Sequence, residues 1–231
     1  MSPVKELRFF VANAASGRQE EVSALFSSPA NPRWLLVLAH GAGAGMHHPF
    51  LQSLSDELNA VGVATFRYQF PYMEGRRGAP DKPAVLTATV AAAVDAAKKA
   101  APGVPFLAGG KSMGGRMTSQ ATAEGMLAEV RGLVFFGFPL HPPGSPGTKR
   151  ADHLARVVEP MLFLQGTRDN FADLKLLRPV CKKLAPRATL HIIDSADHSF
   201  HVLKSSGTSD AAILRQLAQT TASWADKLAK K

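Results

Sequence analysis

Short runs of apolar residues alternate along the chain with longer segments in which apolar positions recur every three or four residues. The short runs are rich in Val, Leu, Ile and Phe, a composition typical of strands that are buried on both faces of a sheet. The longer segments have the period of helices that bury one face. The alternation predicts an α/β fold, a three-layer sandwich in which helices cover both faces of a mostly parallel sheet.

Eight strands are predicted, at residues 6–12, 21–27, 34–39, 63–70, 104–108, 133–138, 161–165 and 189–193. Five helices are predicted, at residues 50–61, 83–100, 113–129, 172–184 and 209–229. The sequence "NAASGRQ" at 13–19 suits a hairpin loop, so the first two strands are expected to be antiparallel. Residues 138–150 form the one long irregular segment, which is too short for a separate lid domain. No Pro- or Gly-rich linker divides the chain, and a single domain over residues 1–231 is predicted.

Composition narrows the classes of function. The net charge of +9 raises the question of nucleic acid, but the basic residues are scattered in pairs instead of clustered, so no nucleic-acid partner is predicted. No apolar run approaches the length of a membrane span, and the start "MSPVKELRFF" has no leader pattern. We therefore expect a cytoplasmic protein without a membrane partner. The single Cys181 cannot form an internal disulfide, which suits a reducing compartment and a structural thiol.

The segment 106–117, "FLAGGKSMGGRM", contains parts of two motifs with different chemistry. Its "GKS" could end a phosphate-binding P-loop, but Pro105 stands where that loop needs its first glycine, and proline has no N–H to donate. A dinucleotide fingerprint is excluded for "HGAGAGM" nearby, because Met46 stands at the third glycine position. Neither segment is predicted to bind a nucleotide.

The same segment fits G-x-S-x-G, the nucleophile elbow, at each position. A buried strand leads into the turn and a helix follows it, which is the context the motif requires. Gly110 and Gly114 flank Ser112, where the chain passes too closely for Cβ atoms. Ser112 is therefore the predicted nucleophile.

A serine nucleophile needs a base and an acid that orients the base. In a fold of this type the acid follows a later strand and the histidine follows the last strand. Asp169 follows the strand in "MLFLQGTRDNFAD", and His198 follows the strand in "ATLHIIDSADHSF". These two residues are the predicted partners of Ser112.

The sequence contains alternative candidates for both the acid and the base. Asp173 lies four residues beyond Asp169, at the start of a predicted helix, and Asp152 precedes its strand. His201 lies three residues beyond His198, and His191 is inside the last predicted strand. Position in the loop favours Asp169 and His198 over all four. 

Two N–H donors are needed to stabilise the oxyanion of an acyl-transfer intermediate. One is expected from Met113, the residue after the nucleophile. The other is expected from "HGAG" after the third strand, where Ala42 is the first choice and Gly43 the alternative.

Three histidines lie in and next to that loop, His40, His47 and His48. No acidic residue stands nearby at ligand spacing, so no metal site is predicted. His40 is interpreted as a side chain that braces the loop.

With these motifs in this order, the chain resembles the α/β-hydrolase superfamily over nearly its whole length, and most of all its small, lidless dienelactone-hydrolase-like branch. The segments "LAHGAGAGM", "FRYQFPYM", "GGKSMGGRM", "LQGTRDNF" and "ADHSF" also resemble a subgroup that includes the hydrolase-like domain of an NSL chromatin-complex subunit. The resemblance implies an eight-stranded sheet, the triad Ser112, Asp169 and His198, and hydrolysis of an acyl bond without a cofactor. Dienelactone hydrolase itself uses a cysteine at the position of Ser112, which argues against its substrate here.

Residues 66–82 cover the end of the fourth predicted strand and the loop after it, at the edge where ligands bind in such folds. The aromatic and apolar candidates for an acyl pocket are Tyr68, Phe70, Tyr72 and Met73. The basic candidates for holding a substrate carboxylate are Arg67, Arg76, Arg77, Lys111 and Arg116. Tyr72, Arg76 and Lys111 are the predicted substrate-binding residues. The alternatives are that the aromatics pack the loop down, that the arginines are solvated, and that Lys111 or Arg116 pairs with a structural carboxylate.

The first hypothesis is a serine esterase or thioesterase that acts on small acyl substrates, some of them anionic, as a monomer or homodimer. The second is a catalytically idle protein-interaction module, since relatives in chromatin complexes use the fold as a scaffold. The third is a peptidase for short peptides, which the lack of a sizeable lid disfavours.

Overall fold

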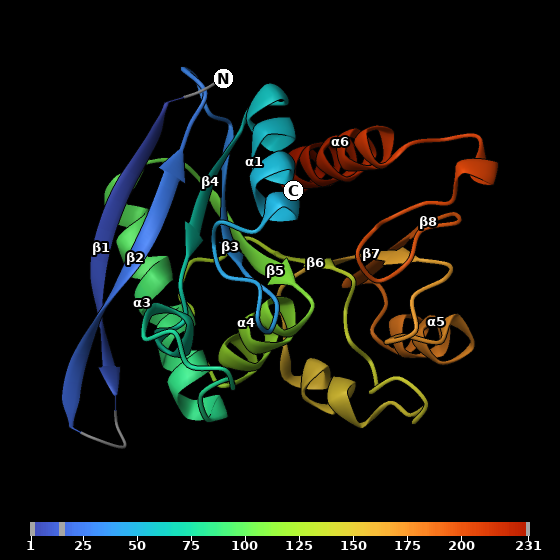
Figure 1. Cartoon of the computed structure of the whole chain (residues 1–231), viewed down its shortest axis with the longest axis horizontal. Helices are drawn as coiled ribbons and strands as arrows, with labels where there is room; N and C mark the ends of the chain where they lie inside the picture. Colours follow the sequence, from blue (N-terminus) through green and yellow to red (C-terminus); the bar gives the residue numbers. More distant parts are fainter. Residues whose placement is uncertain (1–2, 14–16, 230–231) are drawn as a thin grey trace.

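The structure is a computed structural model that describes residues 3–13 and 17–229 (Figure 1). The strands are β1 (Val4–Asn13), β2 (Arg18–Ser27), β3 (Trp34–Ala39), β4 (Val63–Tyr68), β5 (Phe106–Lys111), β6 (Leu133–Phe136), β7 (Met161–Gly166) and β8 (Ala188–Ile193). The α-helices are α1 (Pro49–Ala60), α2 (Pro71–Glu74), α3 (Pro83–Ala100), α4 (Met113–Ala123), α5 (Leu174–Lys183) and α6 (Asp210–Leu228). Two 3₁₀ helices are present, η1 (Lys149–Arg156) and η2 (Lys204–Ser206).

The strands form a single eight-stranded sheet in the order β1-β2-β4-β3-β5-β6-β7-β8. β1 pairs with β2 and β2 with β4 in antiparallel fashion, and every pair from β4 to β8 is parallel. The predicted antiparallel start and parallel remainder are confirmed. Because β3, β5, β6, β7 and β8 run in one direction, the loops after them meet at one edge of the sheet, where ligands bind in open α/β folds.

Helices cover both faces of the sheet, which makes the predicted three-layer sandwich (Figure 1). One core lies between the sheet and α3, α4 and α5, and it includes Val90, Met117 and Leu177. The other core lies between the sheet and α1 and α6, and it includes Leu54 and Leu217. The central strands β3, β4, β6 and β7 are buried along their whole length, as the continuous apolar runs of the sequence indicate.

All eight predicted strands and all five predicted helices are present; β3 and α3 have the predicted bounds, and the other elements have one or both ends shifted. α4 ends at Ala123 instead of residue 129, because Gly125 takes a positive φ of 73° and the N–H of Met126 bonds back to the carbonyl of Ala121. Gly125 therefore ends the helix. The apolar residues after it continue the helical pattern in the sequence, which is why the helix was predicted to be longer. β5 begins two residues later than predicted and runs on through Gly109 and Gly110, which the sequence suggested were already part of the turn.

Three short elements were not predicted. α2 is a single turn with Pro71 at its start, and η2 is equally short, so neither has a detectable period. η1 begins in the last two residues of the segment that was predicted to be irregular and continues beyond it to Arg156, and it packs Leu154 into the core against α4. The rest of that segment, before η1, forms turns without a helix or strand.

The predicted hairpin loop at 13–19 lies partly outside the described residues, since 14–16 are not described. Its ends behave as expected, because Asn13 and Arg18 face each other as the last pair of the β1–β2 ladder. Cys181 is buried in α5, and burial raises the pKa of its thiol to about 11, which suits a structural thiol. Among the described residues, no helix is both long enough and apolar enough to span a membrane.

Candidate active site

Ser112 stands at the sharp turn between β5 and α4. Its backbone has φ 51° and ψ −117°, a conformation that side-chain-bearing residues rarely adopt. The N–H of Ser112 donates to the carbonyl of Phe136 at 3.2 Å, which ties the turn to the end of β6. The strained turn holds the side chain out from the edge of the sheet, as the elbow motif predicts.

The glycines around Ser112 are required by close packing. A Cβ on Gly110 would lie 2.5 Å from the carbonyl oxygen of Ala39, and a Cβ on Gly114 would lie 2.5 Å from that of His40. Real Cβ atoms do not approach backbone oxygens so closely. α4 therefore sits directly against the end of β3, and this contact brings the loop after β3 next to Ser112.

His198 connects the serine to a buried carboxylate. Its Nε2 lies 2.8 Å from Oγ of Ser112, and its Nδ1 lies 2.7 Å from Oδ2 of Asp169. Since the carboxylate can only accept, Nδ1 carries the proton and Nε2 is free to accept from the hydroxyl. The three predicted residues, which are 86 and 29 positions apart in the chain, form one hydrogen-bonded line.

Asp169 is held by more than the histidine. Its side chain is fully buried, and Oδ2 also accepts from Nε2 of Gln165 at 2.5 Å. Oδ1 accepts from the N–H of Phe171 at 2.7 Å. The Phe171 ring stacks on the imidazole of His198 at a centroid distance of 4.2 Å. Two donors besides the imidazole fix the carboxylate, and the phenyl ring covers one face of the histidine.

The loop that carries His198 is fixed at both ends. A bridge joins Ala196 to Val202, and Oδ1 of Asp197 accepts from the N–H groups of Ser199 and His201. These bonds close a short loop with the histidine at its tip, directed at Ser112.

The alternative candidates for the acid and the base lie outside this line of hydrogen bonds. Asp173 caps α5 by accepting from the N–H of Lys175, and Asp152 belongs to η1. His201 is exposed, and its hydrogen bond to Asp210 raises the pKa of its imidazole, so it forms a surface ion pair. His191 faces Gln216 of α6 from within β8.

The loop after β3 passes beside the serine. A Cβ on Gly41 would lie 3.7 Å from Cβ of Ser112. The N–H of Gly43 is already used, since it donates to the hydroxyl of Tyr72 at 3.1 Å. Within the described part of the chain the N–H groups of Ala42 and Met113 have no acceptor. The arrangement favours the first choice, Ala42, over the alternative.

His40 braces this loop, as predicted. It is fully buried, Nε2 accepts from the N–H of Phe70 at 3.1 Å, and Nδ1 donates to the carbonyl of Gly41 at 2.7 Å. Burial lowers the pKa of His40 to about 4, so the imidazole is neutral, as these two bonds require. Across the described residues, no group of three or more His, Cys, Asp and Glu side chains is arranged to hold a metal ion.

The end of β4 and the segment after it support the same loop instead of lining a pocket. Arg67 is fully buried and donates to the carbonyl of Met46 at 3.2 Å, while Gln69 accepts from the N–H of Met46 at 2.8 Å. Tyr72 is buried and holds Gly43, and burial raises the pKa of its hydroxyl. Arg76 is exposed at a positive φ of 53°. Neither Tyr72 nor Arg76 lines the cavity beside Ser112.

Lys111 is directed toward the back of the site. Its Nζ is buried without a hydrogen-bond partner, 5.7 Å from the centroid of the Phe200 ring. A Cβ on Gly137 would lie 3.2 Å from this Nζ and 3.4 Å from Oδ2 of Asp169, so ammonium and carboxylate are neighbours. Burial lowers the pKa of Lys111 to about 8, against the opposing effect of Asp169 and Asp197. The cation therefore stands behind the histidine–aspartate pair.

The cavity beside the serine has a volume of about 260 Å³. It is lined by Gly41, Ala42, Ala44, His48, Phe50, Leu51, Lys111, Ser112, Phe171, His198 and Ser199. The apolar side chains come from the start of α1 and from the loop after β7. Sequence reasoning missed Phe50, Leu51 and Phe171. A signal was available for Phe171, which is two residues beyond Asp169 in the same loop.

A family model described as "Alpha/beta hydrolase domain" matches residues 32–226. The chain belongs to the α/β-hydrolase family. The family also agrees with the sheet order, the elbow and the line of hydrogen bonds from Ser112 to Asp169.

Solved structures of similar fold include other α/β hydrolases. A dienelactone hydrolase from Anabaena variabilis matches with a TM-score of 0.70 and 20% identity, covering 96% of each chain. A lidless α/β serine hydrolase from Xanthomonas campestris matches with a TM-score of 0.72 and 17% identity, also over 96% of each chain. The esterase domain of a Rhodothermus marinus protein matches with a TM-score of 0.70 and 18% identity, over 97% of this chain and 98% of that one.

These likenesses confirm the lidless, dienelactone-hydrolase-like fold. Their identities are low, so they bear on the fold of this α/β hydrolase and leave its substrate open. Family membership supports a hydrolase function for the chain.

Proposed function

We propose that this α/β hydrolase is a serine hydrolase that cleaves carboxylic ester or thioester bonds of small acyl substrates through an acyl-enzyme. The observation that carries the proposal is the position of His198, within 2.8 Å of Oγ of Ser112 and 2.7 Å of Oδ2 of Asp169. A serine hydroxyl is a weak nucleophile by itself and becomes effective when an oriented base can take its proton.

In the proposed reaction, Oγ of Ser112 attacks the acyl carbon while its proton passes to Nε2 of His198. Asp169 keeps the imidazole in the tautomer that can accept this proton and stabilises the imidazolium that forms. The free N–H groups of Ala42 and Met113 are the proposed donors to the oxyanion. The imidazolium then protonates the leaving alcohol or thiol, and a water molecule, activated by the same histidine, releases the acid and restores Ser112.

The cavity favours short acyl groups. Its volume of about 260 Å³ is just below the usual range for small-molecule sites, and Phe50, Leu51 and Phe171 give it apolar walls. Lys111 is the one Lys or Arg among the lining residues, and its Nζ is buried. We therefore propose neutral acyl groups as the preferred substrates, in place of the anionic ones that the sequence suggested.

The test is a series of p-nitrophenyl esters and matched thioesters from acetyl to octanoyl. We expect kcat/KM to be highest for acetyl to butyryl and to fall at least about tenfold by octanoyl, because a longer chain does not fit the cavity. Leu51→Ala should move the optimum to longer chains. The control is Leu203→Ala, which changes an exposed leucine outside the cavity and should leave the profile unchanged. A flat profile in the unmodified enzyme would contradict the proposed acyl specificity, and no turnover of any ester or thioester would contradict the proposed chemistry.

A further inference from the structure

β1 is an edge strand whose outer side is free. The sheet order ends at β1, and no other strand in the described part of the chain pairs with that side. The strand is ten residues long, and two of its side chains, Val4 and Phe10, are large hydrophobic groups that are 44% and 61% exposed. A long edge with exposed apolar side chains is a template for pairing with another strand.

Hydrogen bonds on β2 show which backbone groups of β1 are free. The N–H of Ser23 donates to Oε2 of Glu74, and its carbonyl accepts from the N–H of Gln69, so the backbone of Ser23 faces away from β1. Arg8 is opposite Ser23 in the ladder, so this pair is not hydrogen-bonded and the N–H and C=O of Arg8 point to the free edge. Because the direction alternates, the backbone groups of Val4, Glu6, Phe10 and Ala12 point to the free edge as those of Arg8 do. The four of these residues with large or charged side chains are Val4, Glu6, Arg8 and Phe10.

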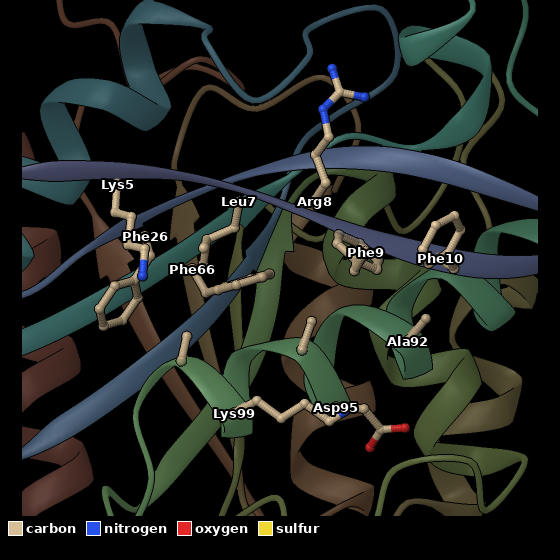
Figure 2. A pocket seen from close by; sticks show the side chains of 12 residues that line it. Lys5, Leu7, Arg8, Phe9, Phe10, Phe26, Phe66, Ala92, Asp95 and Lys99 are labelled. Atoms are coloured by element: carbon tan, nitrogen blue, oxygen red, sulfur yellow. The ribbon is translucent and has the colours of Figure 1, made fainter.

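The side chains of the same four residues share the solvent face of β1. All four are exposed, whereas Phe9 and Val11 are buried toward α3. Figure 2 shows Arg8 pointing to the side of the strand away from α3. In chain order the exposed row is apolar, acidic, basic, apolar, and Nη1 of Arg8 also lies 3.0 Å from Oε2 of Glu21 on β2 in an exposed ion pair. An antiparallel copy of that row presents the complementary sequence of charges.

We propose that β1 pairs with β1 of a second copy of the chain about a two-fold axis, with Leu7 opposite the partner's Leu7. In this register Glu6 faces the partner's Arg8, and Val4 faces the partner's Phe10. The facing residues are the ones whose N–H and C=O groups are free, so each such pair can exchange two backbone hydrogen bonds. The two sheets become one continuous sheet across the axis.

Charge selects this register over its neighbours. A two-fold axis perpendicular to the sheet keeps residues of one face opposite residues of the same face, so the register changes in steps of two. The neighbouring registers place Glu6 opposite the partner's Glu6, or Arg8 opposite the partner's Arg8. Like charges directly opposite each other destabilise a strand pair. The charges of Glu6 and Arg8 disfavour pairing of this edge with most other strands, but in this register they match the charges of a second copy of β1.

The groove on the other face of β1 agrees with the proposal. It lies between β1 and α3, has a volume of about 600 Å³, and contains Leu7 and Phe9 above Ala92 of α3 (Figure 2). Leu7 is only partly buried there. The partner's strand would cover Leu7 and the open side of the groove, which gives these apolar side chains a neighbour.

Sedimentation velocity of the full chain over a concentration series tests the pairing. The unmodified protein should show a reversible dimer. Glu6→Arg and Arg8→Glu should each weaken the dimer about tenfold or more, since each places like charges opposite one another. The double variant Glu6→Arg/Arg8→Glu should restore it, because the charges again match. Arg215→Glu, which makes the same charge change as Arg8→Glu on the exposed face of α6, is the control and should leave the dimer intact.

Amide hydrogen exchange adds a readout at single residues. The N–H groups of Glu6 and Arg8 should be protected in the dimer and should exchange rapidly in the single variants. The N–H of Leu7, which faces β2, should be protected in all of them. A monomer at every concentration would overturn the proposal and leave the edge bare or available to a strand of another protein. A dimer that survives both single variants, or one that the double variant does not restore, would overturn the proposed register. None of these outcomes depends on ester turnover, so the proposed function stands or fails separately.

Discussion

The cavity beside Ser112 and the groove between β1 and α3 differ in the polar groups that point into them. The groove is more than twice as large, about 600 Å³ against about 260 Å³. Its residues come from β1, α3 and the neighbouring strands β2 and β4, which simply lie side by side. The smaller cavity lies where the loops after β3, β5, β7 and β8 meet, and it brings together a nucleophile, a base and two free N–H groups. Convergence of polar groups, more than size, distinguishes a site of chemistry from a surface for packing.

The backbone differs between the two regions as well. Ser112 holds a positive φ, and the glycines on both sides of it leave no space for a Cβ. β1 is regular along its whole length. Strain and close backbone packing therefore mark the cavity, while regular backbone with exposed side chains marks the groove.

The largest expected effect comes from the histidine and aspartate. His198→Ala or Asp169→Asn should lower kcat/KM for a short ester on the order of 10⁴-fold, because the serine then lacks an oriented base. His201→Ala, three residues away on the same loop but outside the cavity, is the matched control and should leave kcat/KM within about twofold. Steady-state kinetics on folded variants measures both. A His198→Ala variant with unchanged kcat/KM would contradict the claim that the cavity beside Ser112 is the site of catalysis.

The next largest effect is expected on stability, from a substitution in the closely packed turn around Ser112. Gly114→Ala should lower the free energy of unfolding by about 2–3 kcal/mol, because its Cβ would meet the carbonyl of His40. Thermal melting should show a decrease of roughly 5–10 °C. Gly147→Ala, in a loop with nothing within 4 Å of the added Cβ, should change the melting temperature by less than about 2 °C. Equal melting temperatures for the two variants would contradict the close contact between α4 and β3.

Replacement of Lys111 is expected to stabilise the protein at neutral pH instead of destabilising it. Its pKa is lowered by burial to about 8, so the folded state carries an unfavourable ammonium. This cost, about 3 kcal/mol, is fully present below pH 8 and disappears as the pH rises from about 8 to 10.5, where only the unfolded chain keeps the proton. Lys111→Met should therefore raise the melting temperature at pH 7 and have little effect at pH 10. Calorimetry at both pH values checks this expectation, and a variant that is less stable at pH 7 would contradict the absence of a partner for Nζ.

The smallest effect is expected at the brace of the oxyanion loop. Tyr72→Phe removes the acceptor of the Gly43 N–H, so the neighbouring Ala42 should be held less firmly. The loss should be about 1 kcal/mol, which is a decrease of roughly three- to tenfold in kcat with KM nearly unchanged. An increase in KM with an unchanged kcat would instead indicate that Tyr72 contacts the substrate.

The sequence contained enough information for the main features of this comparison. The alternation of apolar runs and helical segments predicted the layers, and the rule for chain order singled out Asp169 and His198, because each follows a strand whose end lies at the same edge. Gly110 and Gly114 located the turn, since only close packing calls for glycine on both sides of Ser112.

The lining of the cavity could not be predicted in the same way. Phe50 and Phe171 come from two segments far apart in the chain, and nothing in their local pattern says that they meet. Tyr72, expected to contact the substrate, braces a loop instead, because an aromatic ring with a hydroxyl suits either role. Lys111 was ambiguous for a related reason, since spacing fixes its Cα but not where a flexible side chain places its charge.

The central claim is that Ser112 is an activated nucleophile. The most direct measurement is covalent labelling by a fluorophosphonate, followed by intact mass and peptide mapping. We expect one equivalent of label on Ser112, no label on Ser112→Ala, and labelling slowed at least about 100-fold in His198→Ala. Folded protein that takes up no label, or takes it up at another residue, would contradict the claim.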